Sequence, residues 1–539
     1  MNKKKRLIIV GGLLVFIIVL GIIIGIFYAK KSVKITNKYV GGVQYIDFSE
    51  MGSQPISDSL NINAGGVYTV TGDIDGTIKV DADKKNVKIV LDNANITSNN
   101  GPAIYVDKVD NIYIELVGTN TIKTTTTEEE HGAIFSDHDI CFIGDGSLTI
   151  NSNYDGIVTK DDLQIDGGTI TIKADDDGIV GKDSVVVNNG TINITSEGDG
   201  IKTTNDTGKG TITLRGGEFN ITAQGDDITS ISYMTIEGGT YNLITGTGAT
   251  TSYLNNASMK GLKSKDEMVI TGGTINIQSS DDSIHSDKNI IISGGELNIA
   301  SADDGIHADQ DLIINDGIVN ITKAYEGIEG LNITVNGGDI KVVANDDGFN
   351  AAGGDGSSQG RPGSSNYNET NSSLTITGGN IYVNSSGDGL DSNGNLYIKG
   401  GTIYIDGPIN DGNGAVDYGD NPECKFEVTG GTLIAVGSKG MSVAPTSSSI
   451  VSVLINTTTY KGDITFGDIT YTPSKTYSSI LICSDSLSVG NTYELKIDGN
   501  VVQSITINNN ITTSGTTGFK GGPGGGDHGG GPGGQPPRR

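Results

Sequence analysis

Pairs of neighbouring carboxylates recur at a regular interval along this chain, and they are its side chains best suited to chemistry. Asp281–Asp282 are followed by Asp303–Asp304, then by Tyr325–Glu326 and by Asp346–Asp347. Clustered carboxylate oxygens suit Ca²⁺, which takes about six to eight oxygen ligands in irregular geometry. The predicted metal ligands are Asp281, Asp282, Asp303, Asp304, Glu326, Asp346 and Asp347.

A second explanation for these acidic pairs is turn formation. Asp is common in turns because its side chain bonds to nearby backbone, so the pairs could form a solvated acidic edge. Two carboxylates about 4.8 Å apart repel by roughly 3.5 kcal/mol at an effective dielectric constant of 20. Exposed groups tolerate that repulsion, but its recurrence over several repeats favours a shared cation.

A second row of functional side chains follows the acidic pairs, with Lys263, His285, His307 and Glu329 at the same interval. A lysine beside a calcium site is the base that a polysaccharide lyase needs, and Lys263 and Lys202 are the candidates. A lysine on an outer strand is more often solvated. The two histidines are either metal ligands or members of a polar ladder, and the ladder is favoured.

Tyrosines could bind a sugar. Tyr382 and Tyr404 are one repeat apart at outward strand positions, where an aromatic face can stack on a sugar ring. Tyrosine is also a good strand former, so the two explanations weigh equally. With Lys263, these tyrosines are the predicted ligand-binding residues. The asparagines Asn276, Asn298 and Asn320 form a similar row, which stacked amides explain structurally.

The elements that must position these side chains are short strands. The segments TGGTINI, SGGELNI and NDGIVNI begin at 271, 293 and 315, and their apolar residues alternate with period two. One such unit cannot bury its own apolar face, whereas stacked units share a continuous core. The sequence therefore predicts an all-β fold, a right-handed parallel β-helix with coils of about 22 residues. A β-sandwich with accidental periodicity is much less favoured.

The rest of the chain divides into five predicted segments. They are basic residues and a membrane anchor (1–31), a linker (32–60), the β-helix (61–444), a C-terminal β cap (445–513) and a Gly/Pro-rich tail (514–539). The cap is expected to be antiparallel and to cover the strand edges that a β-helix leaves open at its end.

The N-terminal segment indicates an extracellular protein. Residues 7–29 are uncharged, long enough as a helix to cross a bilayer, and preceded by a basic cluster that stays in the cytoplasm. A single-pass cell-membrane protein is favoured over one secreted after signal cleavage.

Composition excludes several classes. The chain has 36 basic and 64 acidic residues, so nucleic acid is not an expected partner. Its three cysteines, Cys141, Cys424 and Cys483, are too few for a disulfide framework. Without tryptophan, it lacks a flat indole platform for crystalline cellulose.

Several stretches resemble a bacterial surface family of carbohydrate-binding right-handed β-helices. They are GAIFSDHDICFIGDGSLTI, the repeated DDGI, GGTIYIDGPINDGNGAVDY and GGTLIAVGSKGMSVAP. The resemblance spans about residues 60 to 500. It implies a calcium-containing module, similar in fold to pectate lyases, that binds cellulose and polygalacturonate without cleaving them.

The predicted function is accordingly a monomeric, cell-surface, calcium-stabilised polysaccharide-binding protein that is not an enzyme. The alternatives are a calcium-dependent polysaccharide lyase and a structural surface spacer or adhesin without a glycan ligand.

Overall fold

A computed structural model describes most of the chain beyond its N-terminus. The described residues are 41–48, 53–55, 60–125, 131–250, 258–352 and 371–516. The predicted membrane anchor, and the tail beyond residue 516, lie outside them. Within the described ranges, no helix is long and apolar enough to cross a membrane. Contacts divide the chain into residues 1–39 and 40–539, and the fold below is that of the second unit.

Each regular coil contains three short strands, as in β12 (Ile157–Thr159), β13 (Asp162–Ile165) and β14 (Thr169–Ala174). In β14, Ile170 and Ile172 point inward, while Thr169, Thr171 and Lys173 alternate outward. Gly168 turns the chain between the second and third strands with a φ of +84°, a conformation that favours glycine. The following coil repeats this turn at Gly190, with a φ of +125°.

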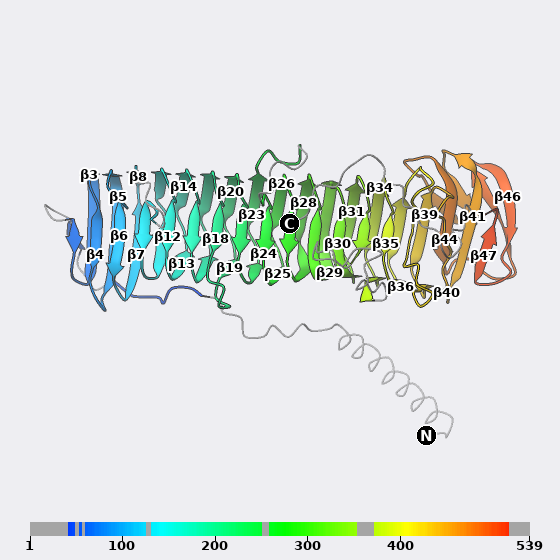
Figure 1. Ribbon diagram of the computed structural model, residues 1–539, viewed down its shortest axis with the longest axis horizontal. Coiled ribbons are helices and arrows are strands. Elements are labelled where there is room, and N and C mark those ends of the chain that lie inside the picture. The colour runs from blue at the N-terminus through cyan, green and yellow to red at the C-terminus, as the bar shows by residue number, and fades with distance from the viewer. Residues whose placement is uncertain are drawn as a thin grey trace, which may run out of the picture. The chain divides into compact units, whose positions relative to one another are not determined.

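Successive coils pair in parallel at the predicted spacing. In β14 and β17 (Thr191–Ser196), Thr169 pairs with Thr191 and Ile172 with Ile194, so each residue lies beside its equivalent in the next coil. Figure 1 shows the coils side by side from β3, in blue, to the cap strands, in orange. The predicted parallel β-helix is therefore confirmed.

The coils build three parallel sheets, defined here by their strands. The short-strand sheet contains β4 (Ile78–Asp81), β6 (Ile104–Lys108), β9 (Ile134–Ser136), β12, β15 (Ile179–Gly181), β18 (Ile201–Thr203), β21 (Ile228–Ser230), β24 (Leu262–Ser264), β27 (Ile284–Ser286), β32 (Phe349–Ala351) and β35 (Leu390–Ser392). The middle sheet contains β7 (Asn111–Val117), β10 (Ile140–Gly144), β13, β16 (Ser184–Val187), β19 (Thr211–Leu214), β22 (Met234–Ile236), β25 (Glu267–Ile270), β33 (Ser373–Ile376), β36 (Asn395–Ile398) and β38 (Phe426–Val428). The long-strand sheet contains β8 (Thr119–Thr124), β11 (Ser147–Ser152), β14, β17, β20 (Glu218–Ala223), β23 (Thr240–Thr245), β26 (Thr274–Ser279), β31 (Asp339–Ala344), β34 (Asn380–Ser385), β37 (Thr402–Asp406) and β39 (Thr432–Gly437).

Some strands continue from one sheet into the next. They are β3 (Gly66–Asp75), β5 (Asn86–Ser98), β28 (Asn289–Ser301), β29 (Ile306–Lys323) and β30 (Ile328–Val335). One apolar core runs through all coils between the three sheets, filled mainly by isoleucine, leucine and valine. Phe219 and Tyr241 stack inside it with ring centroids 4.6 Å apart. The three cysteines are buried.

Part of the predicted linker packs on the β-helix. The backbone N–H of Val43 donates to Gln164 Oε1 at 2.9 Å, and Tyr113 Oη donates to the carbonyl of Gln44 at 2.5 Å. Phe48 packs edge-on against Tyr113, at 5.5 Å between ring centroids. Residues 41–48 therefore lie along the outer face of the middle sheet, because they find apolar partners there.

The C-terminal cap continues the long-strand sheet and adds a second, antiparallel one. Strand β39 pairs antiparallel with β44 (Tyr477–Ser484), which pairs with β41 (Val451–Tyr460), and β41 pairs with β47 (Ile511–Ser514). The second sheet contains β42 (Ile464–Phe466), β43 (Ile469–Tyr471), β45 (Thr492–Ile497) and β46 (Asn500–Thr506). As expected, the cap pairs with the last edge of the β-helix.

Candidate functional site

The acidic residues lie in a column at one corner of the β-helix, just before the short-strand sheet. Backbone N–H groups donate to the carboxylate of the preceding coil, from Asp177 to Asp155 at 2.9 Å, from Asp199 to Asp177 at 2.7 Å and from Asp226 to Asp199 at 2.8 Å. The same bond recurs from Asp304 to Asp282, at 3.1 Å. Part of this column is therefore structural, because each carboxylate accepts an N–H that the turning backbone would leave without a partner.

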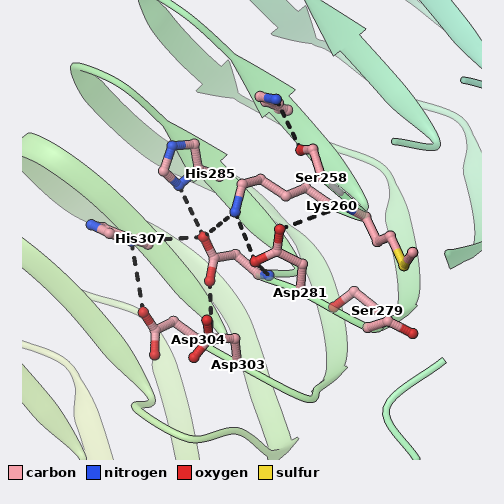
Figure 2. Close-up of polar contacts among 12 residues, drawn as sticks. Ser258, Lys260, Ser279, Asp281, His285, Asp303, Asp304 and His307 are labelled. Carbon is pink, nitrogen blue, oxygen red and sulfur yellow. Dashed lines mark hydrogen bonds and ion pairs between the residues drawn. The ribbon is translucent and has the colours of Figure 1, made fainter. Parts of the chain in front are cut away.

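A lysine neutralises the column at its centre. Lys260 occupies the position one coil before Asp282, and its Nζ lies 2.9 Å from Asp281 Oδ1 and 2.7 Å from Asp282 Oδ2 (Figure 2). Burial alone would lower the pKa of Lys260, but the two carboxylates outweigh it and raise that pKa. The cation that Asp281 and Asp282 share is therefore the ammonium group of Lys260.

The predicted row from Lys263 to Glu329 is also present, because β24, β27, β29 and β30 pair in register at these residues. Lys263 Nζ lies 3.1 Å from Asp226 Oδ2 and 2.9 Å from Ser258 Oγ. Lys263 is thus an ion-pair partner at the acidic corner. Lys202 makes ion pairs with Asp177 and Asp199 in the same way.

The two histidines are largely enclosed among carboxylates, each with a side-chain exposure of 12%. His285 Nδ1 lies 3.0 Å from Asp282 Oδ2, and the two imidazoles meet edge-on at 5.0 Å between centroids. Burial alone would lower the pKa of His307, but Glu329 and Asp282 outweigh it and raise that pKa to about 9. The predicted external polar ladder is therefore a partly buried charge cluster.

Further along the column, carboxylates gather without a lysine. The predicted ligands Asp346 and Asp347 lie near Asp388, Asp391 and Asp417, and among the described residues no ion pair with Lys, Arg or His involves these five. Desolvation is the main cause that raises the pKa of Asp388 to about 8, and repulsion from the neighbouring carboxylates adds to it. The pKa values of Asp347 and Asp391 are raised well above the usual range for the same reasons.

An amide oxygen borders this downstream cluster. Asn350 pairs in register with Asp391 and is 8% exposed, and its Oδ1 has no hydrogen-bond partner within the described part of the chain. Its Nδ2 donates to Glu326 Oε2 at 2.6 Å, which orients the amide. Several carboxylates and one unpaired amide oxygen form the hard, oxygen-only ligand set that calcium prefers.

The outer face of the long-strand sheet has a different chemistry, with a continuous ladder of asparagines. Asn220 Nδ2 donates to Asn193 Oδ1 at 2.9 Å, Asn242 to Asn220 at 2.8 Å and Asn276 to Asn242 at 3.0 Å. The ladder continues through Asn298, at 3.2 Å from Asn276.

Apolar side chains accompany the ladder. Ile244 is 39% exposed and Ile318 is 47% exposed on the same face. Shallow hollows of about 400, 420 and 530 Å³ follow one another along it, sharing Asn242 and Asn298 as lining residues. The face is therefore a long, shallow groove, uncharged in its first two hollows and bordered by Glu296, Asp339 and Lys341 in the third.

The predicted tyrosines lie at the cap end of this groove. Tyr382 and Tyr404 pair in register on β34 and β37, and both line the last hollow. The ring of Tyr404 stacks on Tyr471 of the cap at 5.0 Å, which covers one of its faces. Tyr382 Oη donates to Asp406 Oδ2 at 3.0 Å. Both tyrosines thus help to dock the cap and leave only part of their surface for a ligand.

Residue spacing located the acidic column and the row beside it, but not Lys260, Asp388, Asp391 or Asp417. Lys260 was missed because a single lysine in an aspartate row gives no pattern of its own, although the coil spacing from Asp282 identifies its place. Asp388 begins the same Asp-Gly-apolar motif as Asp304, and Asp391 comes directly after that motif. Both could therefore have been found from the sequence. Asp417 lies beyond an irregular coil, where the spacing fails.

These features define a parallel β-helix with an acidic corner column and an amide-lined outer face. Residues 57–305 match the model of a family described as carbohydrate-binding domain-containing protein, which confirms the predicted resemblance. Over these residues, the chain is therefore similar to the carbohydrate-binding family.

Two known proteins are similar to parts of the chain. A carbohydrate-binding domain-containing protein from Acetivibrio thermocellus is 36% identical over 121 residues, which are 20% of this chain and 42% of that protein. The chain thus spans less than half the length of this relative. A solved structure of a polysaccharide lyase-like protein from C. thermocellum, a gadolinium derivative, shares 28% identity over 44% of this chain and 86% of its own, with a TM-score of 0.31.

Proposed function

We propose that this protein binds polysaccharide chains at the cell surface without cleaving them, and that the glycan lies along the outer face of the long-strand sheet. The observation that carries the proposal is the asparagine ladder with exposed isoleucines beside it. Each ladder amide bonds to its neighbours through one N–H and one oxygen lone pair, which leaves a second acceptor for a ligand. Asn220 and Asn298 also donate to Glu218 and Glu296 at 3.2 Å, so the second donors that a ligand can use are those of Asn242 and Asn276. A sugar hydroxyl is both donor and acceptor, so it matches each amide.

The form of the ligand follows from the same face. Amides repeat about every 4.8 Å along the β-helix, which suits an extended chain of sugar rings better than a single sugar. Exposed isoleucine side chains gain about 25 cal/mol for every Å² of apolar surface that a sugar ring covers. Plant cell-wall glycans such as cellulose and polygalacturonate are the proposed ligands.

Calcium is the second part of the proposal, at the downstream cluster of Asp346, Asp347, Asp388, Asp391 and Asp417. Within the described residues, its carboxylates lack the ammonium partner that Lys260 supplies to Asp281 and Asp282. Bound Ca²⁺ would relieve their repulsion, and an acidic protein could use it to hold an acidic glycan. Of the remaining predicted ligands, Asp304 faces His307, Asp303 lies with Asp281 and Asp282, and Glu326 accepts the amide of Asn350.

A lyase is the weaker candidate. The predicted base Lys263 is held by Asp226 and Ser258, and Lys202 by Asp177 and Asp199. Desolvation lowers the pKa of Lys202, but Asp177 and Asp199 outweigh it and raise that pKa, which makes Lys202 a poor base.

Binding can be measured by depletion of the protein on amorphous cellulose and on immobilised polygalacturonate, each with Ca²⁺ or EDTA. The double variant Ile244→Asp with Ile318→Asp should lower affinity at least about tenfold, equivalent to about 1.4 kcal/mol, because it puts charge into the groove. Val501→Asp is the matched control, since Val501 is 53% exposed on the cap. Wild-type protein that retains neither glycan would contradict the proposal and favour a surface spacer. Absorbance near 235 nm during incubation with polygalacturonate would reveal a lyase.

Calcium can be tested by thermal unfolding. Ca²⁺ at 100 times its Kd should stabilise the protein by about 2.7 kcal/mol, and Asp391→Asn with Asp417→Asn should remove most of that gain. Asp145→Asn, a change of an exposed aspartate in a turn, should leave it intact. Equal calcium stabilisation in all three proteins would place the ion elsewhere.

A further inference from the structure

His307 lies between carboxylates from three successive coils. Its Nδ1 is 3.7 Å from Asp282 Oδ2, 3.7 Å from Asp304 Oδ2 and 3.6 Å from Glu329 Oε2. Figure 2 shows the ring facing Asp304 beside His285. Strand pairing explains the arrangement, because His285, His307 and Glu329 are in register on adjacent strands.

The outer nitrogen of each imidazole faces a different carboxylate. His285 Nε2 is 3.2 Å from Asp287 Oδ1, and His307 Nε2 is 3.4 Å from Asp309 Oδ1. An acceptor at Nε2 holds the proton on that nitrogen and turns Nδ1 inward, where a bound ion would take the place of the Nδ1 proton. Histidines that bind metals usually donate their other ring N–H to a carboxylate in this way.

The distances around Nδ1 are those of ligand atoms that share an ion. At 3.6–3.7 Å, they exceed ordinary hydrogen-bond lengths. Ligands about 2.0–2.2 Å from a tetrahedral ion lie roughly 3.3–3.6 Å from one another. Asp304, His307 and Glu329 each offer one atom to a set lying within 4.8 Å of one another. Small side-chain movements would therefore close this set around an ion.

The other oxygen of Asp304 is already occupied. Asp304 Oδ1 accepts the backbone N–H of Glu326 at 3.1 Å, which fixes the carboxylate with Oδ2 toward His307. Lys260 binds Asp281 and Asp282, one coil earlier, and makes no ion pair with Asp304 among the described residues. Asp304 thus faces the His307 imidazole, whereas its equivalent Asp282 contacts both the Lys260 ammonium group and His285.

We propose that Asp304 Oδ2, His307 Nδ1 and Glu329 Oε2 bind a divalent first-row transition metal such as Zn²⁺, with Asp282 at its edge. Imidazole nitrogen suits these metals, whereas calcium prefers oxygen alone. Asp304 and His307 belong to one coil and Glu329 to the next, so the ion joins two successive coils at the acidic corner. This site is separate from the downstream calcium cluster and does not depend on glycan binding.

The test uses the full chain, stripped of metal with a chelator and titrated with Zn²⁺ in the presence of excess Ca²⁺. One Zn²⁺ per chain should bind, and His307→Gln should weaken it by at least about 100-fold, because loss of a supporting partner alone costs about 10–100-fold. Asp309→Asn, which leaves all three ligands in place, should weaken binding about tenfold or more. His138→Gln is the control histidine outside the cluster.

A spectroscopic measurement separates this site from a calcium site. Cu²⁺ bound in place of Zn²⁺ should show nitrogen hyperfine splitting in its EPR spectrum, lost in His307→Gln and kept in His138→Gln. Circular dichroism establishes that each variant is folded, and Asp309→Asn supplies the test if His307→Gln is not. Zn²⁺ affinity unchanged in the folded variants, or a bound ion that Ca²⁺ displaces readily, would overturn the proposal.

Discussion

Asp227 is a carboxylic acid at a position where the neighbouring coils have glycine. Backbone hydrogen bonds align it with Gly200 on one side and Gly261 on the other. It is fully buried, and neither carboxyl oxygen has hydrogen-bonding geometry with any side chain or backbone group of the described residues. Burial raises the pKa of Asp227 well above the ordinary value, and the nearby carboxylates of Asp226 and Asp199 add to this.

We expect Asp227→Gly to stabilise the protein near pH 7.5. A buried polar group without partners costs about 1–3 kcal/mol, which exceeds the roughly 0.5–1 kcal/mol that a glycine loses in a strand. Denaturant unfolding should therefore show a net gain of about 1 kcal/mol. Asp145→Gly, at an exposed turn, should give no such gain.

The same variant should change the pH dependence of stability. A carboxyl with a raised pKa in the folded state binds its proton more tightly folded than unfolded, so its contribution to stability falls as pH rises above about 4. Removing it should flatten the decline of stability from acid toward neutral pH. An unchanged slope would show that Asp227 does not titrate in this range.

At the scale of elements, Asp406 at the end of β37 docks the cap. Its Oδ1 accepts Tyr471 Oη at 2.7 Å, and its Oδ2 accepts the backbone N–H of Ser474 at 2.8 Å and Tyr382 Oη at 3.0 Å. Lys475 Nζ donates to the carbonyl of Asp406 at 3.2 Å. One fully buried carboxylate thus joins the long-strand sheet to the second cap sheet.

Asp406→Ala should loosen the cap without unfolding the coils. Hydrogen bonds to a charged group contribute about 1.5–3 kcal/mol each, so their joint loss should destabilise the cap by about 3 kcal/mol or more. Hydrogen exchange should accelerate in β42, β43 and β45 and stay slow in β14 and β17. Asp468→Ala, an exposed change in the same sheet, should leave exchange unaltered, and uniform acceleration would mean that cap and coils unfold together.

At the scale of the molecule, each coil contacts only its neighbours, so stability is close to a sum over coils. Deleting residues 169–190 removes one whole coil and joins Gly168 to Thr191. The backbones of these two residues already form a hydrogen bond with each other between adjacent coils. The shortened protein should fold, with a Tm lower by about 2–8 °C and unchanged β-sheet circular dichroism.

Deleting only residues 180–190 is the contrasting experiment. It removes half a coil, so the strands that follow no longer align with their equivalents in the preceding coil. Their inward and outward positions then lose their partners, and the protein should fail to fold. Equal stability of the two deletions would show that the register of the coils does not control the fold.

The sequence alone determined the repeat, the three-strand coil and the apolar core. Apolar residues that alternate with period two and glycine turns one coil length apart are local patterns. Parallel stacking of the coils is the arrangement that buries the apolar residues. It also located the acidic column and the row of Lys263, His285 and His307, because spacing is maintained wherever coils have equal length.

Only the tertiary structure decided what each level of that column does. Asp282 and Asp304 are the same residue type at equivalent positions, yet Lys260 neutralises the first and His307 faces the second. Asp417, beyond an irregular coil, joins Asp347 and Asp391 without a regular spacing, and Tyr404 lies under Tyr471 of the cap. These differences depend on side chains that meet across coils, and the charge and burial of a carboxylate depend on such neighbours more than on its place in the repeat.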